Sequence, residues 1–78
     1  MATILLLGPA REAAGTRRDT IDAATLDELL RHATERYGAE FARILEFSMV
    51  WVNGEATAPD CSIGPQDEVA ILPPVSGG

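Results

Sequence analysis

The chain has 78 residues, of which 46% are hydrophobic and 23% are charged. This length allows one compact domain, because a second domain would leave each half too small to enclose a core. Twelve acidic residues stand against six basic ones, all arginine, which gives a formal net charge of −6. Nucleic acids and anionic membranes require a basic surface, so we expect neither as a ligand and expect a protein partner with a basic docking surface.

Cys61 is the only cysteine in the sequence. A single cysteine excludes an internal disulfide and a cysteine-rich zinc site, so the composition favours a cytoplasmic location. The apolar run Ile4–Leu7 is too short to cross a bilayer or to form the core of a signal peptide. We therefore expect a cytoplasmic protein that is mature from Met1.

The first third of the chain predicts a strand, a short helix and a second strand. Residues Ala2–Leu7 are rich in Ile and Leu and are followed by the breakers Gly8 and Pro9. Pro9 suits the first turn of a helix, and Gly15 is placed to end that helix after about two turns. The segment Arg18–Ile21 is a weaker strand candidate.

The middle of the chain contains the main predicted helix, Leu26–Tyr37. Thr25 and Glu28 have the spacing of a capping box, and Gly38 stands where a left-handed residue ends many helices. Apolar side chains recur at helical spacing between these two ends. The next segment, Ala39–Phe47, has a less regular pattern and predicts a short helix or turn packed under the core.

Two further strands are predicted near the end of the chain. Met49–Val52 is followed by Asn53-Gly54, the sequence typical of a two-residue hairpin turn, and Glu68–Leu72 is the last strand. This order of elements predicts an α+β fold with a mixed sheet of four to five strands and one main helix packed on one face. We expect this domain to span residues 1–72.

The predicted strands carry apolar side chains on both faces, although the main helix covers only one. If Val50 and Val52 point inward, then Met49 and Trp51 point to the open face. Leu7, Trp51 and Leu72 are therefore expected to form an exposed apolar patch, and contiguous patches of this kind mark binding surfaces.

Residues 73–78 are predicted to form a flexible C-terminal tail. Pro73 and Pro74 favour a stiff and extended exit from the last strand, whereas Gly77 and Gly78 have no side chains. A bare tail of this kind fits a narrow channel in a partner. Terminal glycines alone are more typical of a frayed end.

Several segments, spread over the whole chain, resemble the small subunit of molybdopterin synthase, a ubiquitin-like sulfur carrier. The segments are Ile4–Leu7, Ala10-Arg11-Glu12 with Gly15, Val52-Asn53, Asp67–Ala70 and Pro73–Gly78. The resemblance implies a β-grasp fold. It also implies that a partner ATPase adenylates the carboxylate of Gly78, that sulfur replaces the AMP, and that the large synthase subunit uses this thiocarboxylate to build the molybdopterin dithiolene.

The resemblance also implies the partners and the site. The partners are the large synthase subunit, expected in a heterotetramer, an adenylating ATPase of the ubiquitin-activating type, and a sulfur donor protein. The chain is expected to hold no cofactor and no metal, and ATP is used by the ATPase. The partner-facing positions implied by the family are Leu7, Arg11, Leu72, Pro73, Pro74, Val75, Ser76 and Gly77, with Gly78 as the reacting residue.

Two positions depart from the family pattern. Ala56 stands where the family has a larger apolar contact, and Trp51 is not a family residue, so its place in the binding surface rests on the strand pattern alone. Three other functions remain open: a sulfur carrier for thiamine, a sulfur carrier for cysteine synthesis, and a protein modifier that forms isopeptide bonds. The sequence shows no catalytic constellation for an independent enzyme, and we assign no role to Cys61.

Overall fold

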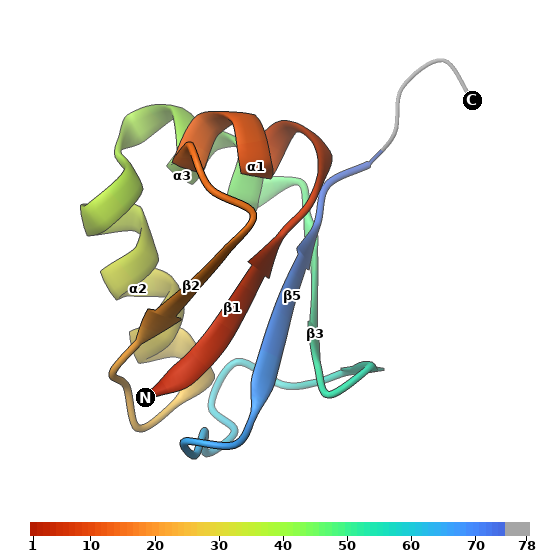
Figure 1. Ribbon diagram of the computed structural model, residues 1–78. Coiled ribbons are helices and arrows are strands. Elements are labelled where there is room, and N and C mark those ends of the chain that lie inside the picture. The colour runs from red at the N-terminus through yellow and green to blue at the C-terminus, as the bar shows by residue number, and fades with distance from the viewer. Residues whose placement is uncertain (75–78) are drawn as a thin grey trace.

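The computed structural model describes residues 1–74, which form one five-stranded sheet and three helices (Figure 1). Within these residues no helix is both long and apolar enough to span a membrane. The elements are β1 (Ala2–Leu6), α1 (Gly8–Ala14), β2 (Arg18–Ile21), α2 (Leu26–Tyr37), α3 (Ala39–Glu46), β3 (Met49–Val52), β4 (Glu55–Ala56) and β5 (Glu68–Leu72).

The sheet is mixed and has the strand order β2-β1-β5-β3-β4. The first and last strands, β1 and β5, pair in parallel at its centre, with Leu6 beside Ile71. All other pairings are antiparallel. Parallel neighbours require a crossover connection, and here it contains the three helices and the other three strands, β2, β3 and β4. The predicted α+β architecture with a mixed sheet is confirmed.

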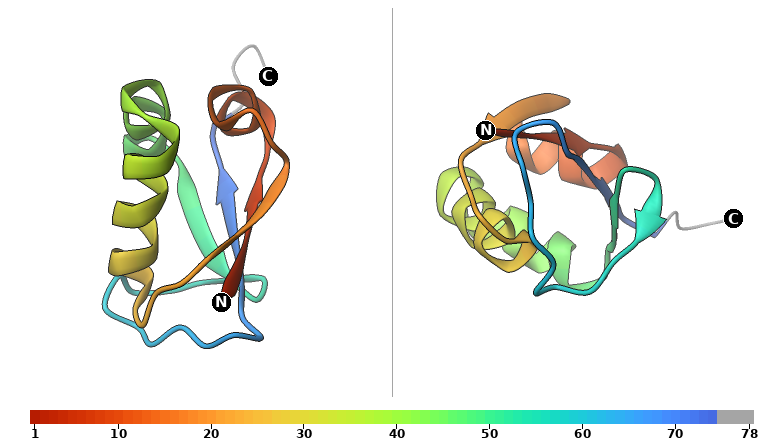
Figure 2. Two further views of the ribbon diagram at one scale, coloured as in Figure 1. Left: turned by 60° about the vertical axis from the view of Figure 1, so that its left-hand side comes forward. Right: turned by 90° about the horizontal axis from the view of Figure 1, so that it is seen from below.

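The helices α2 and α3 lie on one face of the sheet, and α1 lies at the end where β5 finishes (Figures 1 and 2). The core between these layers contains Ile4, Leu6, Leu29, Phe41, Val69 and Ile71, all with 0% exposure. The Tyr37 and Phe41 rings meet edge to face at 5.2 Å, which joins α2 to α3. The predicted main helix therefore has a second helix beside it.

Local sequence signals place the boundaries of these elements. The Thr25 hydroxyl accepts a hydrogen bond of 3.2 Å from the Glu28 backbone N–H and so caps α2. Asn53 and Gly54 have φ values of 53° and 83°, as a type I′ hairpin turn between β3 and β4 requires. Both signals were correctly interpreted from the sequence.

One helix end differs from the prediction. Gly38 has a φ of 101° but a ψ of −173°, so it is not in the left-handed helical conformation. The reason is that α3 begins at Ala39, and the chain must turn sharply between the two helices rather than leave α2 gradually. Positive φ nevertheless makes glycine the suitable residue at this position.

Candidate functional site

The strand register determines which side chains face away from the helices. Leu72 lies on the opposite face from the buried Ile71, because successive side chains of a strand alternate. Met49 pairs with Leu72, and Trp51 pairs with Ala70, so both share the open face. The predicted orientation of β3 is therefore confirmed.

The exposed large apolar side chains gather at the end of the sheet where β5 finishes. Among residues 1–74 these are Leu7 at 40%, Phe47 at 74% and Met49 at 57% exposure. Met1, the other exposed large apolar residue, lies at the opposite end of the sheet, where β5 begins (Figure 1). Leu7 directly follows β1 next to the end of β5, and Met49 pairs with Leu72. We call Leu7, Phe47, Met49, Leu72, Pro73 and Pro74 the apolar collar.

A small apolar groove forms part of this collar. Its volume is about 160 Å³, and its walls come from α1, α3 and the segment after β5. The lining residues are Pro9, Ile44, Phe47, Pro73 and Pro74. The chain therefore leaves β5 with exposed apolar surface on both sides, the open sheet face on one side and this groove on the other.

The collar differs in membership from the patch that the sequence predicts. Trp51 and Leu72 are only partly exposed, and the Trp51 indole Nε1 is buried without a hydrogen-bond partner among residues 1–74. Phe47, the most exposed large apolar side chain of the described chain, was not predicted as part of the surface. Phe47 directly follows the last residue of α3, and this position could have indicated an exposed side chain. The sequence, however, predicted only a short helix or turn in this segment.

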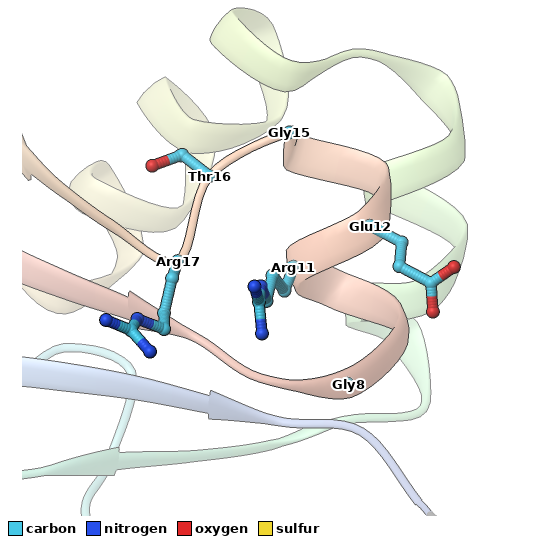
Figure 3. A pocket seen from close by; sticks show the side chains of 6 residues that line it. All are labelled: Gly8, Arg11, Glu12, Gly15, Thr16 and Arg17. Carbon is cyan, nitrogen blue, oxygen red and sulfur yellow. The ribbon is translucent and has the colours of Figure 1, made fainter.

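A pocket of about 610 Å³ lies next to the collar, between α1 and the loop that leads to β2 (Figure 3). It is lined by Gly8, Arg11, Glu12, Gly15, Thr16 and Arg17. Figure 3 shows the Arg11 and Arg17 guanidiniums on the same side of this pocket, whereas the Glu12 carboxylate points away from them. Arg11 was expected at the site, but Arg17 was not.

The two acidic residues before and at the start of β5 have structural partners. The Asp67 carboxylate accepts hydrogen bonds from the Gly64 backbone N–H at 2.7 Å and from Asn53 Nδ2 at 3.0 Å. These bonds lower the pKa of Asp67 below its usual value. Glu68 forms an ion pair of 3.4 Å with Arg18 on the open face. Asp67 therefore holds the β3–β4 turn against the start of β5.

Cys61 lies in the loop between β4 and β5, and both its backbone and its side chain make structural contacts. Its backbone carbonyl accepts a hydrogen bond of 3.0 Å from Leu26 at the start of α2, and its side chain packs partly against the core. The part of the chain that the structure describes contains no cluster of three or more potential metal-ligating side chains.

The structure brings together most of the residues predicted for partner binding. Leu7, Leu72, Pro73 and Pro74 belong to the apolar collar, Arg11 lines the adjacent pocket, and Trp51 lies on the open face. Ala56, where the resemblance implied a larger side chain, is exposed opposite Trp51 at the edge of the sheet. The predicted positions Val75, Ser76, Gly77 and Gly78 lie outside the described residues.

A mixed five-stranded sheet with its first and last strands paired at the centre and helices on one face defines a ubiquitin-like β-grasp protein. The sequence profile of the ThiS family matches residues 4–78, and the chain belongs to this family. It is a ubiquitin-like sulfur carrier or modifier of the ThiS type. No curated protein matches the chain.

Solved structures show the same fold over the whole chain. SAMP1 from Haloferax volcanii is 31% identical, with 99% of this chain and 98% of that chain covered and a TM-score of 0.83. The BexX/CysO complex of Amycolatopsis orientalis contains a chain that is 24% identical, with 100% of both chains covered and a TM-score of 0.83. A Pyrococcus furiosus protein named as molybdopterin converting factor, subunit 1, is 19% identical, with 95% and 97% covered and a TM-score of 0.80.

Proposed function

We propose that the protein is the sulfur carrier subunit of molybdopterin synthase and that Gly78 carries the sulfur as a thiocarboxylate. The observation that supports this proposal is the apolar collar, which surrounds the start of the segment that leads to Gly77 and Gly78. A partner that holds the collar receives the following residues in a fixed direction. The family membership and the double-proline motif support the same function.

The proposed chemistry begins with activation of the Gly78 carboxylate. A carboxylate is a poor electrophile, so one of its oxygens attacks the α-phosphorus of ATP in the partner ATPase, and pyrophosphate leaves. Hydrosulfide supplied by the donor protein then attacks the acyl carbon, the bond from this carbon to the AMP oxygen breaks, and AMP leaves with that oxygen, so that Gly78 becomes a thiocarboxylate. The large synthase subunit takes this sulfur for the dithiolene of molybdopterin.

The chain itself supplies the docking surface and the group that is transferred. Glycine at positions 77 and 78 keeps the reacting end narrow enough to enter two different active sites, that of the ATPase and that of the synthase. In this mechanism ATP belongs to the partner, and the carrier needs no bound cofactor. The proposed complex with the large subunit is a heterotetramer.

Protein modification is a second candidate function. It is favoured by one specific observation, the 31% identity with SAMP1, the H. volcanii small archaeal modifier protein 1. The same acyl-adenylate serves both functions, but a modifier transfers its glycine carbonyl to the amine of a target lysine. The sequence contains no lysine, so chains linked through this protein's own lysine side chains are excluded.

Intact mass measurement tests the proposal. After incubation with the partner ATPase, ATP and a sulfur donor, we expect exchange of one oxygen for sulfur at Gly78. A variant with one additional residue after Gly78 is the control, and it should fold normally but receive no sulfur. An isopeptide product without thiocarboxylate would support the modifier function, and an unchanged mass of the wild-type protein would contradict both.

A further inference from the structure

A further hollow lies between α1 and α3, which contact each other at the end of the sheet where β5 finishes (Figure 1). Its volume is about 280 Å³. Its lining residues, which we call the helical cleft, are Pro9, Glu12, Ala13, Glu40 and Ile44. None of these residues belongs to the apolar collar, so a partner that holds the collar need not cover the helical cleft.

The apolar part of the helical cleft is surface that the core does not use. Pro9 is exposed, and Ala13 and Ile44 are half-buried. Phe41, about one turn earlier on α3, is fully buried, so the apolar stripe of α3 leaves the core at Ile44. The volume lies below the range of about 300–1,000 Å³ that is usual for small-molecule pockets. The cleft therefore suits a side chain of a protein partner better than a cofactor.

The charged part of the helical cleft is acidic. Glu12 from α1 points away from the two arginines of the neighbouring pocket (Figure 3), and Glu40 comes from the first turn of α3. The pair between Glu40 and Arg43 has a length of 3.4 Å, and both side chains are more than half exposed, so it is a weak pair that a partner can replace. A lysine or arginine fits these walls, because its aliphatic stem packs on Ala13 and Ile44 while its charge faces carboxylates.

The position of the helical cleft relates it to the reacting end of the chain. Pro9 and Ile44 also line the groove of the collar, so the two hollows adjoin. Pro74 lines that groove, and Gly78 follows Pro74 by four residues, which span at most about 14 Å. In the proposed mechanism the acyl-adenylate forms while the ATPase holds the carrier. The sulfur donor must then reach Gly78 from a surface that the ATPase does not occupy.

We propose that the helical cleft binds a lysine or arginine of the sulfur donor protein, which approaches the carrier from the side of α1 and α3 while the ATPase holds the collar. This inference rests on the proposed function and deepens it, because it assigns the two proteins to separate surfaces of one small domain. It also gives the net charge of −6 a specific use, since the basic docking surface expected of a partner belongs to the donor.

Charge reversal with two sources of sulfur tests this assignment. Glu12→Arg and Glu40→Arg are compared with Glu35→Arg, which makes the same change at an exposed position of α2 outside the cleft. Each variant is incubated with the ATPase and ATP. Sulfur comes either from the donor protein, purified by its ability to supply sulfur to the wild-type carrier, or from sodium sulfide, which needs no docking surface. The rate of thiocarboxylate formation is measured by intact mass at low and at physiological salt.

We expect the source of sulfur to decide the result. With the donor protein, each cleft variant should be about tenfold or more slower than wild type and less sensitive to salt, with Glu35→Arg within about twofold of wild type. With sodium sulfide, all variants should react within about twofold of wild type, because adenylation does not use the cleft. All three variants should keep the wild-type melting temperature, since the three positions are exposed.

The other results separate this inference from the proposed function. Cleft variants that match Glu35→Arg with both sources would show that the donor does not use the cleft, and the carrier function would stand. Cleft variants that are slow with both sources would assign the cleft to the ATPase and overturn its assignment to the donor. A wild-type carrier that accepts sulfur from sulfide but from no protein fraction would remove the donor and this inference. No thiocarboxylate from either source would contradict both proposals.

Sedimentation of the free carrier tests a second copy of this chain as the occupant. We expect a monomer for the wild-type protein and for Glu12→Arg at the same concentrations. A wild-type dimer that Glu12→Arg dissociates would assign the cleft to self-association and overturn its assignment to the donor.

Discussion

The two faces of the sheet are built from the same alternating strands, yet they differ in what covers them. On the helix side, Ile4, Leu6 and Ile71 have 0% exposure. On the open side, where Figure 2 shows no helix over the strands, Met49 is 57% exposed. Burial on one face is sufficient to form the core, so the apolar side chains of the other face are available for a partner.

Two phenylalanines in and next to α3 give the largest expected contrast between these surfaces. Phe41 has 0% exposure and Phe47 has 74%. Phe41→Ala should lower the free energy of unfolding by about 3–5 kcal/mol, because it removes a buried ring and leaves a cavity. Phe47→Ala should change it by less than about 0.5 kcal/mol.

Urea unfolding of both variants measures the change in stability. Binding of the ATPase to folded Phe47→Ala measures the contribution of this side chain to the collar. Phe47→Ala should weaken binding although it does not affect stability. Equal stability losses for the two variants would show that Phe47 is covered in solution and does not belong to the collar.

A charge placed on the open face is the next largest test. Leu72→Glu should weaken partner binding by about 2–4 kcal/mol, because it places an unpaired carboxylate in an apolar interface. The fluorescence of Trp51, which shares this face with Leu72, should shift to the blue when the wild-type protein binds. A collapsed melting temperature of Leu72→Glu, in place of lost binding, would mean that Leu72 belongs to the core.

A polar cluster on the helix side predicts how stability depends on pH. The Tyr37 hydroxyl donates a hydrogen bond of 2.7 Å to Asp19, and Arg36 lies 3.0 Å from the same carboxylate oxygen. The bond from Tyr37, followed by Thr20 and Arg36, lowers the pKa of Asp19. Burial and the same hydrogen bond raise the pKa of Tyr37 to about 12.

Tyr37→Phe should therefore cost about 1 kcal/mol near neutral pH, at the low end for a bond to a charged group because the carboxylate is partly exposed. The contribution of Asp19 is present above its unfolded pKa of 3.8 and is lost as the pH falls through the lower folded value. The contribution of Tyr37 is present below pH 10 and is lost between pH 10 and about 12. Thermal melts of wild type and Tyr37→Phe from pH 2 to 12 should converge at both extremes, and a constant difference would contradict this linkage.

The smallest expected effect is that of Cys61→Ser. Sulfur is carried on the Gly78 carboxylate in the proposed mechanism, and the described structure provides no activating group for the thiol. Sulfur transfer with both partners should therefore remain within about twofold of wild type. A folded Cys61→Ser protein that transfers no sulfur would require a covalent role for this cysteine.

The parts of the fold that were predicted correctly have strong local signals. The Thr25 cap, the Asn53-Gly54 turn and the alternation in β3 each act over a few residues, so the sequence alone places them. Gly38 was predicted less well, because its ψ depends on the direction in which α3 continues. Helix propensity does not contain that information.

The candidate site was predicted only in part, because its members meet through tertiary structure. Leu7 and Leu72 were predicted from the alternation of side chains along a strand, and Arg11 was predicted from the family resemblance. Arg17 and Phe47 come from loops whose position depends on how α1 and α3 pack at the end of the sheet.

The central position of β5 has a mechanical consequence for the proposed function, in which the residues after β5 enter a partner. Backbone hydrogen bonds hold β5 on both sides, to β1 in parallel and to β3 in antiparallel orientation. A force applied along Pro73 and Pro74 therefore acts in shear on two ladders of backbone hydrogen bonds at once. A force on an edge strand such as β4 would act on a single ladder and could break it one pair at a time. The body can thus resist traction on its C-terminal segment without the last strand peeling away.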